Sequence, residues 1–565
     1  MDPEMSKNDN IVSPIQKLNQ DCLISILSKL PMADLVRCER VCQNWREVSL
    51  QSWSAFRKLF LTPEYLGLRP IGTRHTYKDI TENVLEQVLK RCGRFLQEFR
   101  SRRTKFDASL LIAEYCKNIQ SIKIPVMSIA RMEKLGKNCT KISELDFDVY
   151  KQCNQKFDEA LGNLFLNNNK LRSFNLSIDS QYELSSDCIL KLPLHQMTTI
   201  DISLTKENLR IISKYAKNLR NLDYYGNDLK HLEIISLNLS NLTELRLNFD
   251  ECYEGDPDLL LSQVFKSNRQ LKIIHLGSFR YMTGECFVDL DKNTVEEIEI
   301  THAESILGDE LIKSWPYFEN FRKLRFIEYD GEDFLKISEC LSLCANFKEF
   351  AISFNEHCED KTLENAEVFI KCFASSKSLE ILYFDADIEM DKFCDFIGKN
   401  LLELRCLYLG SECVTITSSS IQSLSYLKKL REFDLEIVFS RKKEIPDFES
   451  VGKLTNLEVL DFNCYIDKFT GSELENLTNL RKLYCPGSLN LKEINIINLV
   501  KRAPNLELLD IAGCKKITNS LIDVAIEVTK NRTNNILLQI NIYGTSIDIN
   551  KIREHSPLLY LNDKS

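Results

Sequence analysis

A short apolar unit recurs along most of the chain. In it, one apolar residue is followed by a second three positions later and a third five positions later, as in Leu242, Leu245 and Leu247. Eighteen such units occur at a mean spacing of about 26 residues. They begin at Leu96, Ile119, Ile142, Leu171, Met197, Leu219, Leu242, Leu271, Val295, Leu324, Phe347, Leu379, Leu404, Leu430, Leu457, Leu480, Leu506 and Leu537.

The second and third apolar positions of each unit fall on one side of a short strand, because side chains alternate along a strand. Between the units lie stretches with helical apolar spacing, such as 107–116, 259–266 and 520–528. Each helix can cover the apolar side of its strand, and stacked units close a continuous core. Pattern and period resemble the leucine-rich repeat over about four fifths of the chain. The resemblance implies an α/β solenoid of about 18 repeats with parallel concave strands and convex helices.

Residues 15–60 differ from the repeats and contain three closely spaced helical patterns. Pro31 separates the first pattern from the second. Within one window of about 35 residues come Ile-Leu-x-x-Leu-Pro ending at Pro31, Asp34-Leu35, and Val-Cys-x-x-Trp ending at Trp45. This combination resembles the F-box, although Asn19 stands where many F-boxes have proline.

A module this short has more apolar residues than it can bury alone, which implies a partner surface. In the F-box family the partner is a Skp-type adaptor, which joins the F-box protein to a cullin ubiquitin ligase. By resemblance, the adaptor-binding residues are Leu18, Ile26, Leu27, Leu30, Pro31, Leu35, Cys42 and Trp45. Trp45 is the best single candidate because large aromatic side chains often dominate interfaces, although it could also belong to the core of the module. Other candidates for that core are Leu23, Ile24, Val41 and Val48.

These patterns divide the chain into five segments. A flexible tail (1–14) precedes the F-box (15–60), and a connector rich in proline and glycine (61–78) follows it. We expect 79–95 to form a capping helix at the N-terminal end of the solenoid, which then extends over 96–561.

Composition narrows the possible functions. The net charge of −9 argues against a nucleic-acid binder. No run of 18 apolar residues and no apolar signal segment occurs, so we expect a cytoplasmic or nuclear protein that does not bind membranes. The twenty cysteines include no C-x-x-C pair and are predicted to be reduced and mostly buried. Cys38 and Cys42 have helical spacing but no second pair nearby to complete a zinc site.

Motifs of catalysis are absent from the sequence. G-x-G-x-x-G, G-x-S-x-G and H-E-x-x-H do not occur, and the seven histidines are scattered. We therefore predict a protein without catalytic residues, cofactor or metal.

The expected concave face is acidic. Positions two, four and six residues after each unit's start should point outward, and they hold 18 acids but only five bases. The candidate substrate-binding residues are Glu297, Glu299, Phe326, Glu328, Asp330, Tyr383, Tyr408, Glu432, Asp434 and Glu436. This clustering favours a protein substrate with a basic recognition surface. The alternative is that the acids only keep an exposed sheet soluble.

An F-box followed by leucine-rich repeats resembles a family of substrate receptors across nearly the whole chain. In that family the F-box docks to the Skp–cullin ligase, and the repeats bind a protein for ubiquitination and proteasomal degradation. The alternative is an interaction scaffold that binds the adaptor without delivering a substrate. A receptor for a small ligand or nucleic acid rests only on the basic run at 91–105.

Overall fold

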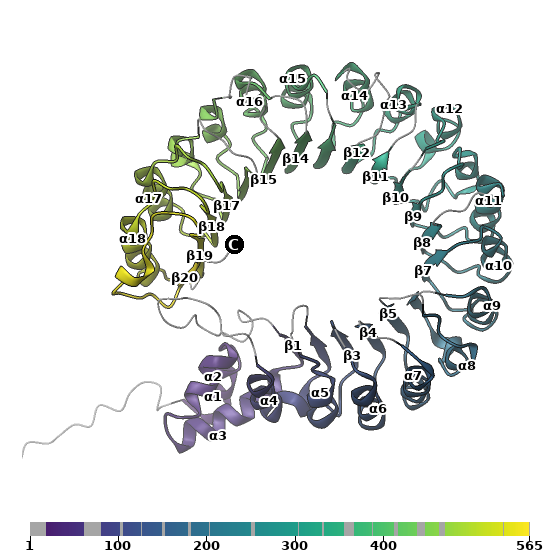
Figure 1. Cartoon of the computed structure of the whole chain (residues 1–565), viewed down its shortest axis with the longest axis horizontal. Helices are drawn as coiled ribbons and strands as arrows, with labels where there is room; N and C mark the ends of the chain where they lie inside the picture. Colours follow the sequence, from purple (N-terminus) through teal and green to yellow (C-terminus); the bar gives the residue numbers. More distant parts are fainter. Residues whose placement is uncertain are drawn as a thin grey trace, which may run out of the picture. The chain divides into compact units, whose positions relative to one another are not determined.

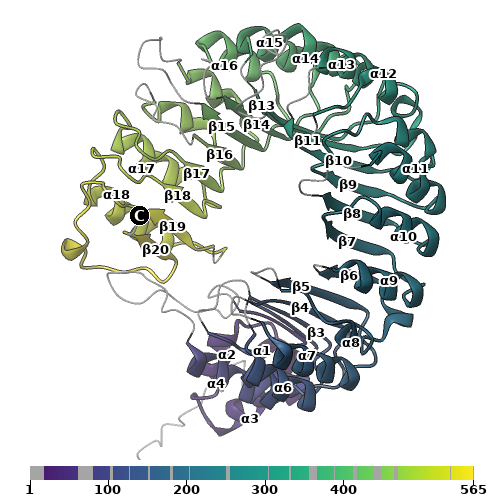
Figure 2. The ribbon, with the colours of Figure 1, turned by 45° about the vertical axis from the view of Figure 1, so that its right-hand side comes forward.

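The computed structural model describes residues 18–61, 81–101, 106–125, 127–149, 153–178, 182–202, 204–249, 255–302, 304–329, 333–354, 366–386, 388–411, 416–437, 447–462, 469–534 and 536–563. The chain forms two compact units (Figures 1 and 2). Unit 1 comprises 1–69, 79–182 and 191–193, and unit 2 comprises 70–78, 183–190 and 194–565. None of the described helices has the length and apolar character needed to cross a membrane.

Unit 1 begins with three helices and continues as strand–helix repeats. Its elements are α1 (Gln20–Leu27), α2 (Met32–Cys38), α3 (Gln43–Ser52), η2 (Trp53–Ala55), β1 (Lys58–Phe60), α4 (Glu82–Cys92), η3 (Gly93–Phe95), β2 (Glu98–Arg100), α5 (Ser109–Tyr115), β3 (Ser121–Ile124), α6 (Ile129–Asn138), β4 (Glu144–Val149), α7 (Gln155–Asn167) and β5 (Ser173–Ile178). The Oδ1 of Asn19 accepts a hydrogen bond from the backbone N–H of Cys22 at 2.8 Å. Asn19 therefore caps α1 and gives the helix a defined start without proline.

Strands β1 to β5 pair in parallel and in chain order. Leu59 of β1 pairs with Phe99 of β2, and both are buried. Phe56, Leu59 and Leu61 repeat the apolar spacing of the later units, so the ladder begins one strand earlier than the eighteen predicted starts. This first strand lies inside the range predicted for the F-box.

A partly buried ion pair joins the three N-terminal helices to α4. The guanidinium of Arg91 donates to both carboxylate oxygens of Glu39 at 2.9–3.1 Å, and the indole N–H of Trp53 donates to Glu39 Oε1 at 2.8 Å. Trp53 is fully buried. Because charge-assisted hydrogen bonds of this kind hold their partners in a fixed geometry, the helical module is tied to the first repeats within unit 1.

Unit 2 consists of further repeats. Its elements are α8 (Ser186–Ile189), η4 (Leu194–Gln196), β6 (Thr199–Ile202), α9 (Lys206–Tyr215), β7 (Asn221–Gly226), α10 (His231–Asn238), β8 (Glu244–Phe249), α11 (Pro257–Ser267), β9 (Ile273–Gly277), η5 (Glu285–Asp289), β10 (Glu297–Thr301), α12 (Gly308–Leu311), η6 (Trp315–Tyr317), β11 (Lys323–Tyr329), α13 (Phe334–Ser342), β12 (Glu349–Phe354), α14 (Ala366–Cys372), β13 (Ile381–Asp385), α15 (Met390–Asn400), β14 (Cys406–Ser411), α16 (Ser418–Leu424), β15 (Glu432–Ile437), η8 (Glu449–Lys453), β16 (Val459–Asp461), η9 (Ser472–Asn476), β17 (Lys482–Tyr484), α17 (Glu493–Arg502), β18 (Leu508–Asp510), α18 (Asn519–Lys530), β19 (Leu538–Asn541), η10 (Ile549–Lys551) and β20 (Leu559–Asn562).

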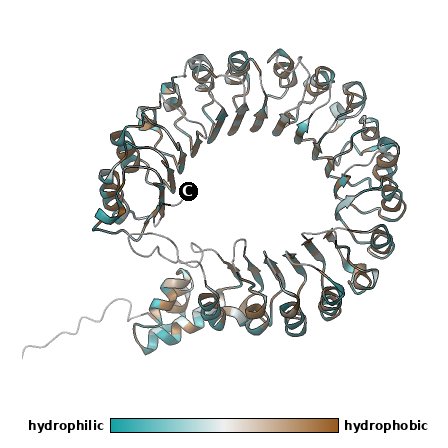
Figure 3. Ribbon diagram, viewed as in Figure 1, coloured by the Kyte–Doolittle hydropathy of each residue, from teal (hydrophilic) through white to brown (hydrophobic). Residues whose placement is uncertain are grey.

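Strands β6 to β20 also pair in parallel and in chain order. Helices lie along one side of the strands, and hydrophobic residues recur in both kinds of element (Figures 1 and 3). Along β8, Leu245, Leu247 and Phe249 are buried while the residues between them are not. This confirms the strand–helix solenoid predicted from the apolar spacing. β20, with buried Leu559 and Leu561, is a further strand beyond the predicted starts.

Asparagines immediately before the repeat starts hold successive turns together. The side-chain amide of Asn241 donates to the carbonyl of Lys217 at 2.9 Å, and Asn479 donates likewise to Thr455 at 3.0 Å. Equivalent bonds are made by Asn118, Asn218, Asn320, Asn346 and Asn456. Each bond satisfies a backbone carbonyl in the preceding turn and so fixes the stacking of adjacent repeats.

The structure corrects the predicted register of one repeat. Leu324 pairs with Ile298, which occupies the second apolar position of its own unit, so the repeat starts at Phe321 rather than at Leu324. Phe326 is consequently fully buried, with its ring 6.0 Å from that of Trp315 and 5.7 Å from that of Tyr329. The outward positions of β11 are occupied by Lys323 and Arg325 instead.

Candidate binding surfaces

The three N-terminal helices leave apolar side chains exposed. Val41 is 63% exposed, Ile26 46%, Leu50 44% and Leu18 38%. Full burial of one such side chain contributes about 1.5–3 kcal/mol, so together they could contribute substantially to binding a partner. We call these four residues the F-box outer face.

The predicted adaptor-binding residues divide into three groups. Leu18, Ile26, Pro31 and Cys42 are exposed, and Leu30 and Trp45 are half-buried. Leu27 and Leu35 are 3% and 0% exposed, so they belong to the module's core. The prediction that they contact an adaptor is therefore wrong for this structure. Val41 was expected in the core but is the most exposed of the large apolar residues in this module. Leu23 and Val48 are buried as expected, and Ile24 is half-buried.

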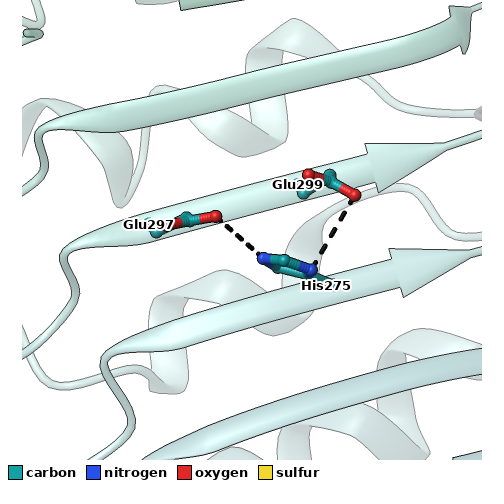
Figure 4. Close-up of side chains that lie close together, drawn as sticks. All are labelled: His275, Glu297 and Glu299. Carbon is teal, nitrogen blue, oxygen red and sulfur yellow. Dashed lines mark hydrogen bonds and ion pairs between the residues drawn. The ribbon is translucent and has the colours of Figure 1, made fainter. Parts of the chain in front are cut away.

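The second surface belongs to the strands of unit 2. Buried residues alternate along each strand with half-buried or exposed ones, so the two kinds lie on opposite sides. We call the side with the half-buried and exposed residues the open face. On β9 and β10 it carries a histidine between two glutamates (Figure 4). His275 Nε2 lies 2.9 Å from Glu297 Oε1, and His275 Nδ1 lies 3.8 Å from Glu299 Oε1. Three charged or chargeable groups therefore meet across neighbouring strands.

Two cations of β11 lie beside the same carboxylates. Lys323 Nζ is 3.2 Å from Glu297 and 3.6 Å from Glu349 of β12. Arg325 is 3.6 Å from Glu299 and 2.5 Å from Glu349. Positive and negative side chains thus alternate from β9 to β12, which is the favourable arrangement for directly opposed cross-strand neighbours.

His275, Glu297 and Glu299 could also offer three ligand atoms to a metal, since these atoms lie within 4.8 Å of one another. Burial favours the protonated form of Glu297, yet hydrogen bonds from His275 and Lys323 lower its pKa to about 2. The Glu297 carboxylate is thus already held ionised by neighbouring groups of the protein itself. The geometry favours a self-contained ion network over a metal centre.

The open face of β13–β18 has a different character. Tyr383, Tyr408, Asp434, Asp461, Tyr484 and Asp510 stand opposite one another in the strand register, one from each strand. The two tyrosine rings of β13 and β14 lie 6.1 Å apart. We call these six residues the tyrosine–aspartate row. Glu432 and Glu436, on the same side of β15, are exposed and add further negative charge.

Burial and neighbouring carboxylates change the ionisation of this row. Burial, with a contribution from Glu436, raises the pKa of Asp434 to about 6. Burial, together with Asp434 and Asp510, raises the pKa of Asp461 to about 7. Among the described residues, neither carboxylate has a hydrogen bond or an ion pair. The row therefore carries negative charge at a cost that the network on β9–β12 avoids.

The predicted substrate-binding residues do not all meet. Glu297 and Glu299 lie together, as do Tyr383, Tyr408, Glu432, Asp434 and Glu436 on β13–β15. Phe326 is in the core, so it cannot contact a substrate on the open face. Glu328 lies at an irregularity near the end of β11, has a φ of 51°, and pairs with His302 at 3.0 Å. Asp330 lies outside the described residues.

Sequence reasoning missed the residues that neutralise the first group. Lys323 and Arg325 were hidden by the register error, and His275 was not weighed although it occupies an outward position four residues after Leu271. Correct phasing of β11 against β10 would have placed the two cations beside Glu297 and Glu299.

Comparisons with known proteins agree with this architecture. The family model described as F-box-like matches residues 20–62. F-box/LRR-repeat protein 17 of Arabidopsis thaliana is 28% identical over 133 residues, which are 23% of this chain. Residues 20–62 therefore resemble an F-box, and the strand–helix repeats that follow resemble leucine-rich repeats. The match spans only 20% of the length of the Arabidopsis relative.

Two solved structures are similar to this chain. The complex of Rad7 and Elc1 in yeast matches with a TM-score of 0.37 and 17% identity, covering 77% of this chain and 88% of that one. The mouse RP105/MD-1 complex matches with a TM-score of 0.42 and 14% identity, covering 87% and 86%. The fold assignment itself rests on the strand ladders and helices of the chain.

Proposed function

We propose that this chain is the substrate-recognition subunit of a Skp–cullin–F-box ubiquitin ligase, acting in the cytoplasm or nucleus. Its F-box docks onto a Skp-type adaptor, and through it onto a cullin, while the repeats bind a protein that is then ubiquitinated and degraded. In this role the chain contributes binding surfaces, and other subunits carry out the catalysis.

The F-box outer face carries this proposal. Exposed apolar residues crowd onto a module of three short helices that matches the F-box-like model. Such a patch is costly in water and is typical of a protein interface. The ion pair between Glu39 and Arg91 would then transmit the position of the docked adaptor to the first repeats of unit 1.

The adaptor step is tested by co-purification with a Skp-type adaptor. The variant carrying Ile26→Asp and Val41→Asp should lose the adaptor, because two charges replace the most exposed apolar residues of the outer face. The matched control is Leu237→Asp on α10, where a still more exposed leucine (81%) lies in a repeat far along the chain. It should retain the adaptor. Since all three positions are on the surface, thermal unfolding should change little in either variant.

Retention of the adaptor by the folded Ile26→Asp, Val41→Asp protein would exclude this face as the docking site. Trp45→Ala, and Leu30→Asp combined with Pro31→Ala, test the half-buried part of the interface. Delivery is tested separately by affinity capture with and without a proteasome inhibitor. A partner enriched only under inhibition supports degradation, whereas equal recovery favours a scaffold that binds the adaptor without delivering a substrate.

A further inference from the structure

In the tyrosine–aspartate row on the open face of β13–β18, Asp434 and Asp461 have no ion pair with any cation among the described residues. Asp434 and Asp461 occupy neighbouring strands, which are about 4.8 Å apart in a ladder of this kind. Tyr408 precedes them and Tyr484 follows them in the same register. Two adjacent carboxylates are therefore flanked on both sides by aromatic rings.

The only base at the outward positions of these described strands is Lys482 on β17. It stands in the register of Glu432 and Val459, two residues along the strands from the tyrosine–aspartate row. No ion pair joins it to the row among the described residues. Like charges on adjacent strands also repel one another. Burial is the main cause of the raised pKa values of Asp434 and Asp461, and nearby carboxylates add to it, from Glu436 for Asp434 and from Asp434, Asp510 and Glu436 for Asp461.

The shape of the site favours an organic cation over a metal. Within the described part of the chain, the His275 group alone brings three potential metal ligands within 4.8 Å, so the row does not gather a coordination sphere. A planar guanidinium has donors that can reach two separate carboxylates, and it stacks on aromatic faces. Lysine can supply the charge but not the fork or the stacking.

We propose that the tyrosine–aspartate row binds an extended segment of a partner protein through an arginine whose guanidinium bridges Asp434 and Asp461 between Tyr408 and Tyr484. This rests on the proposed function in one respect, namely that the repeats hold the substrate. Charge complementarity selects the partner, and the exposed Glu432 and Glu436 steer it toward the face.

The binding experiment uses the full chain co-purified with its adaptor. The probe is a fluorescein-labelled peptide of sequence Gly-Ser-Arg-Gly-Ser-Arg-Gly-Ser, and its counterparts carry lysine or neutral citrulline in place of arginine. Fluorescence anisotropy at pH 8 and low salt should show binding of the arginine peptide, several-fold weaker binding of the lysine peptide, and none of the citrulline peptide. Binding should weaken at higher salt.

The decisive variant is Asp434→Asn with Asp461→Asn, which should reduce affinity for the arginine peptide at least tenfold. Its matched control is Glu297→Gln with Glu299→Gln, which removes the same charge from the same face and should change affinity less than twofold. Equal losses in both would mean that only net charge matters and would overturn the site. Unchanged affinity in the Asp434, Asp461 variant would overturn it as well.

The pH dependence of peptide binding provides a second test of the same site. Between pH 8 and pH 5.5, Asp434 and Asp461 take up protons, so the arginine peptide should dissociate. The other titratable groups facing them are Cys406 and Tyr408 on β14, Glu432 and Glu436 on β15, Lys482 and Tyr484 on β17, and Asp510 on β18. Affinity independent of pH would contradict the assignment to the two aspartates.

A competing occupant lies in the chain itself. Arg441, Lys442 and Lys443 follow β15 in the sequence and lie outside the described residues. If they fill the row, the parent protein will not bind the peptide, and the triple serine variant will; that outcome would overturn the partner proposal. If the row takes a partner, the triple variant will bind like the parent. Adaptor co-purification, measured on every preparation, separates failure of this site from failure of the F-box role.

Discussion

The open faces of β9–β12 and β13–β18 have the same backbone but opposite electrostatic arrangements. On the first, Glu297, Glu299 and Glu349 each lie beside a histidine, lysine or arginine of a neighbouring strand. On the second, Asp434 and Asp461 lie beside other acids, and burial raises the pKa of each. The strand ladder thus fixes where outward side chains stand but not whether their charges are paired. Paired charges stabilise the solenoid, whereas a ligand of opposite charge can gain binding free energy by pairing with carboxylates that lack a partner.

The largest effect is expected when the balanced region is made to resemble the acidic one. Lys323→Glu with Arg325→Glu removes the cations of β11 and places new acids beside Glu297, Glu299 and Glu349. We expect a loss of about 3 kcal/mol in the free energy of unfolding, measured by urea denaturation at pH 8. Lys482 has no ion pair among the described residues, so Lys482→Glu is the control. It should lower the free energy of unfolding by less than about 1 kcal/mol. Equal losses in both would show that the ion network does not stabilise β9–β12.

The second prediction relieves the strain in the acidic region. The pKa of Asp461 is raised to about 7 in the folded chain from an ordinary value of 3.8, so the folded state is favoured at low pH and loses stability as the pH rises between these values. Asp461→Asn should therefore stabilise the protein at pH 8 by about 1–2 kcal/mol, allowing for solvent screening, and the gain should vanish near pH 4.

Asp510→Asn is the contrasting variant for that experiment. Its carboxylate oxygens accept hydrogen bonds from the N–H of Ala512 at 3.0 Å and from the amide of Asn541 at 2.7 Å. Replacing one acceptor by an amide should therefore destabilise by about 1 kcal/mol at pH 8. A gain in stability for Asp510→Asn would show that general removal of acid, rather than the unpaired state of Asp461, is responsible.

The smallest effect tests what the two regions share. Asn346 and Asn456 precede repeats in the balanced and acidic regions, and each amide donates to a carbonyl of the preceding turn, at 3.2 and 2.8 Å. Alanine at either position should cost about 1 kcal/mol, and the two losses should agree within about 0.5 kcal/mol. A large difference in thermal unfolding between the two variants would mean that the backbone ladder, and not only its charges, differs between the regions.

The F-box shows how far amphipathic patterning reaches. The apolar spacing within residues 15–60, which includes Ile26, Leu27 and Leu35, predicted three helices with more apolar residues than they could bury. Three helices form within this range. Pattern alone did not tell the core from the outer face: Leu27 and Leu35 are buried, while Val41 is exposed. Both faces of so short a module are apolar, so only the packing of α1 against α3 decides which side chains turn inward.

The same limit appears at β11. Phe321, Leu324 and Phe326 fit the apolar spacing of a repeat, but so do Leu324, Ile327 and Tyr329. Local hydrophobicity cannot choose between two phases that satisfy it equally. The pairing of Leu324 with Ile298 decides the phase and turns Lys323 and Arg325 toward the open face.

The sequence by itself determined the repeating strand–helix architecture, because periodic apolar residues must be buried in any folded arrangement, and its motifs ending at Pro31 and Trp45 carried the resemblance to the F-box. Tertiary structure decided which charges meet, since Glu297 and Lys323 are separated by a whole repeat and become neighbours only through strand pairing. It likewise decided that Asp434 and Asp461 stand side by side, with no ion pair to either in the part of the chain that the structure describes. Apolar spacing predicts that each repeat has a buried side, whereas the phase of a strand and the pairing of its charges depend on the register of the ladder.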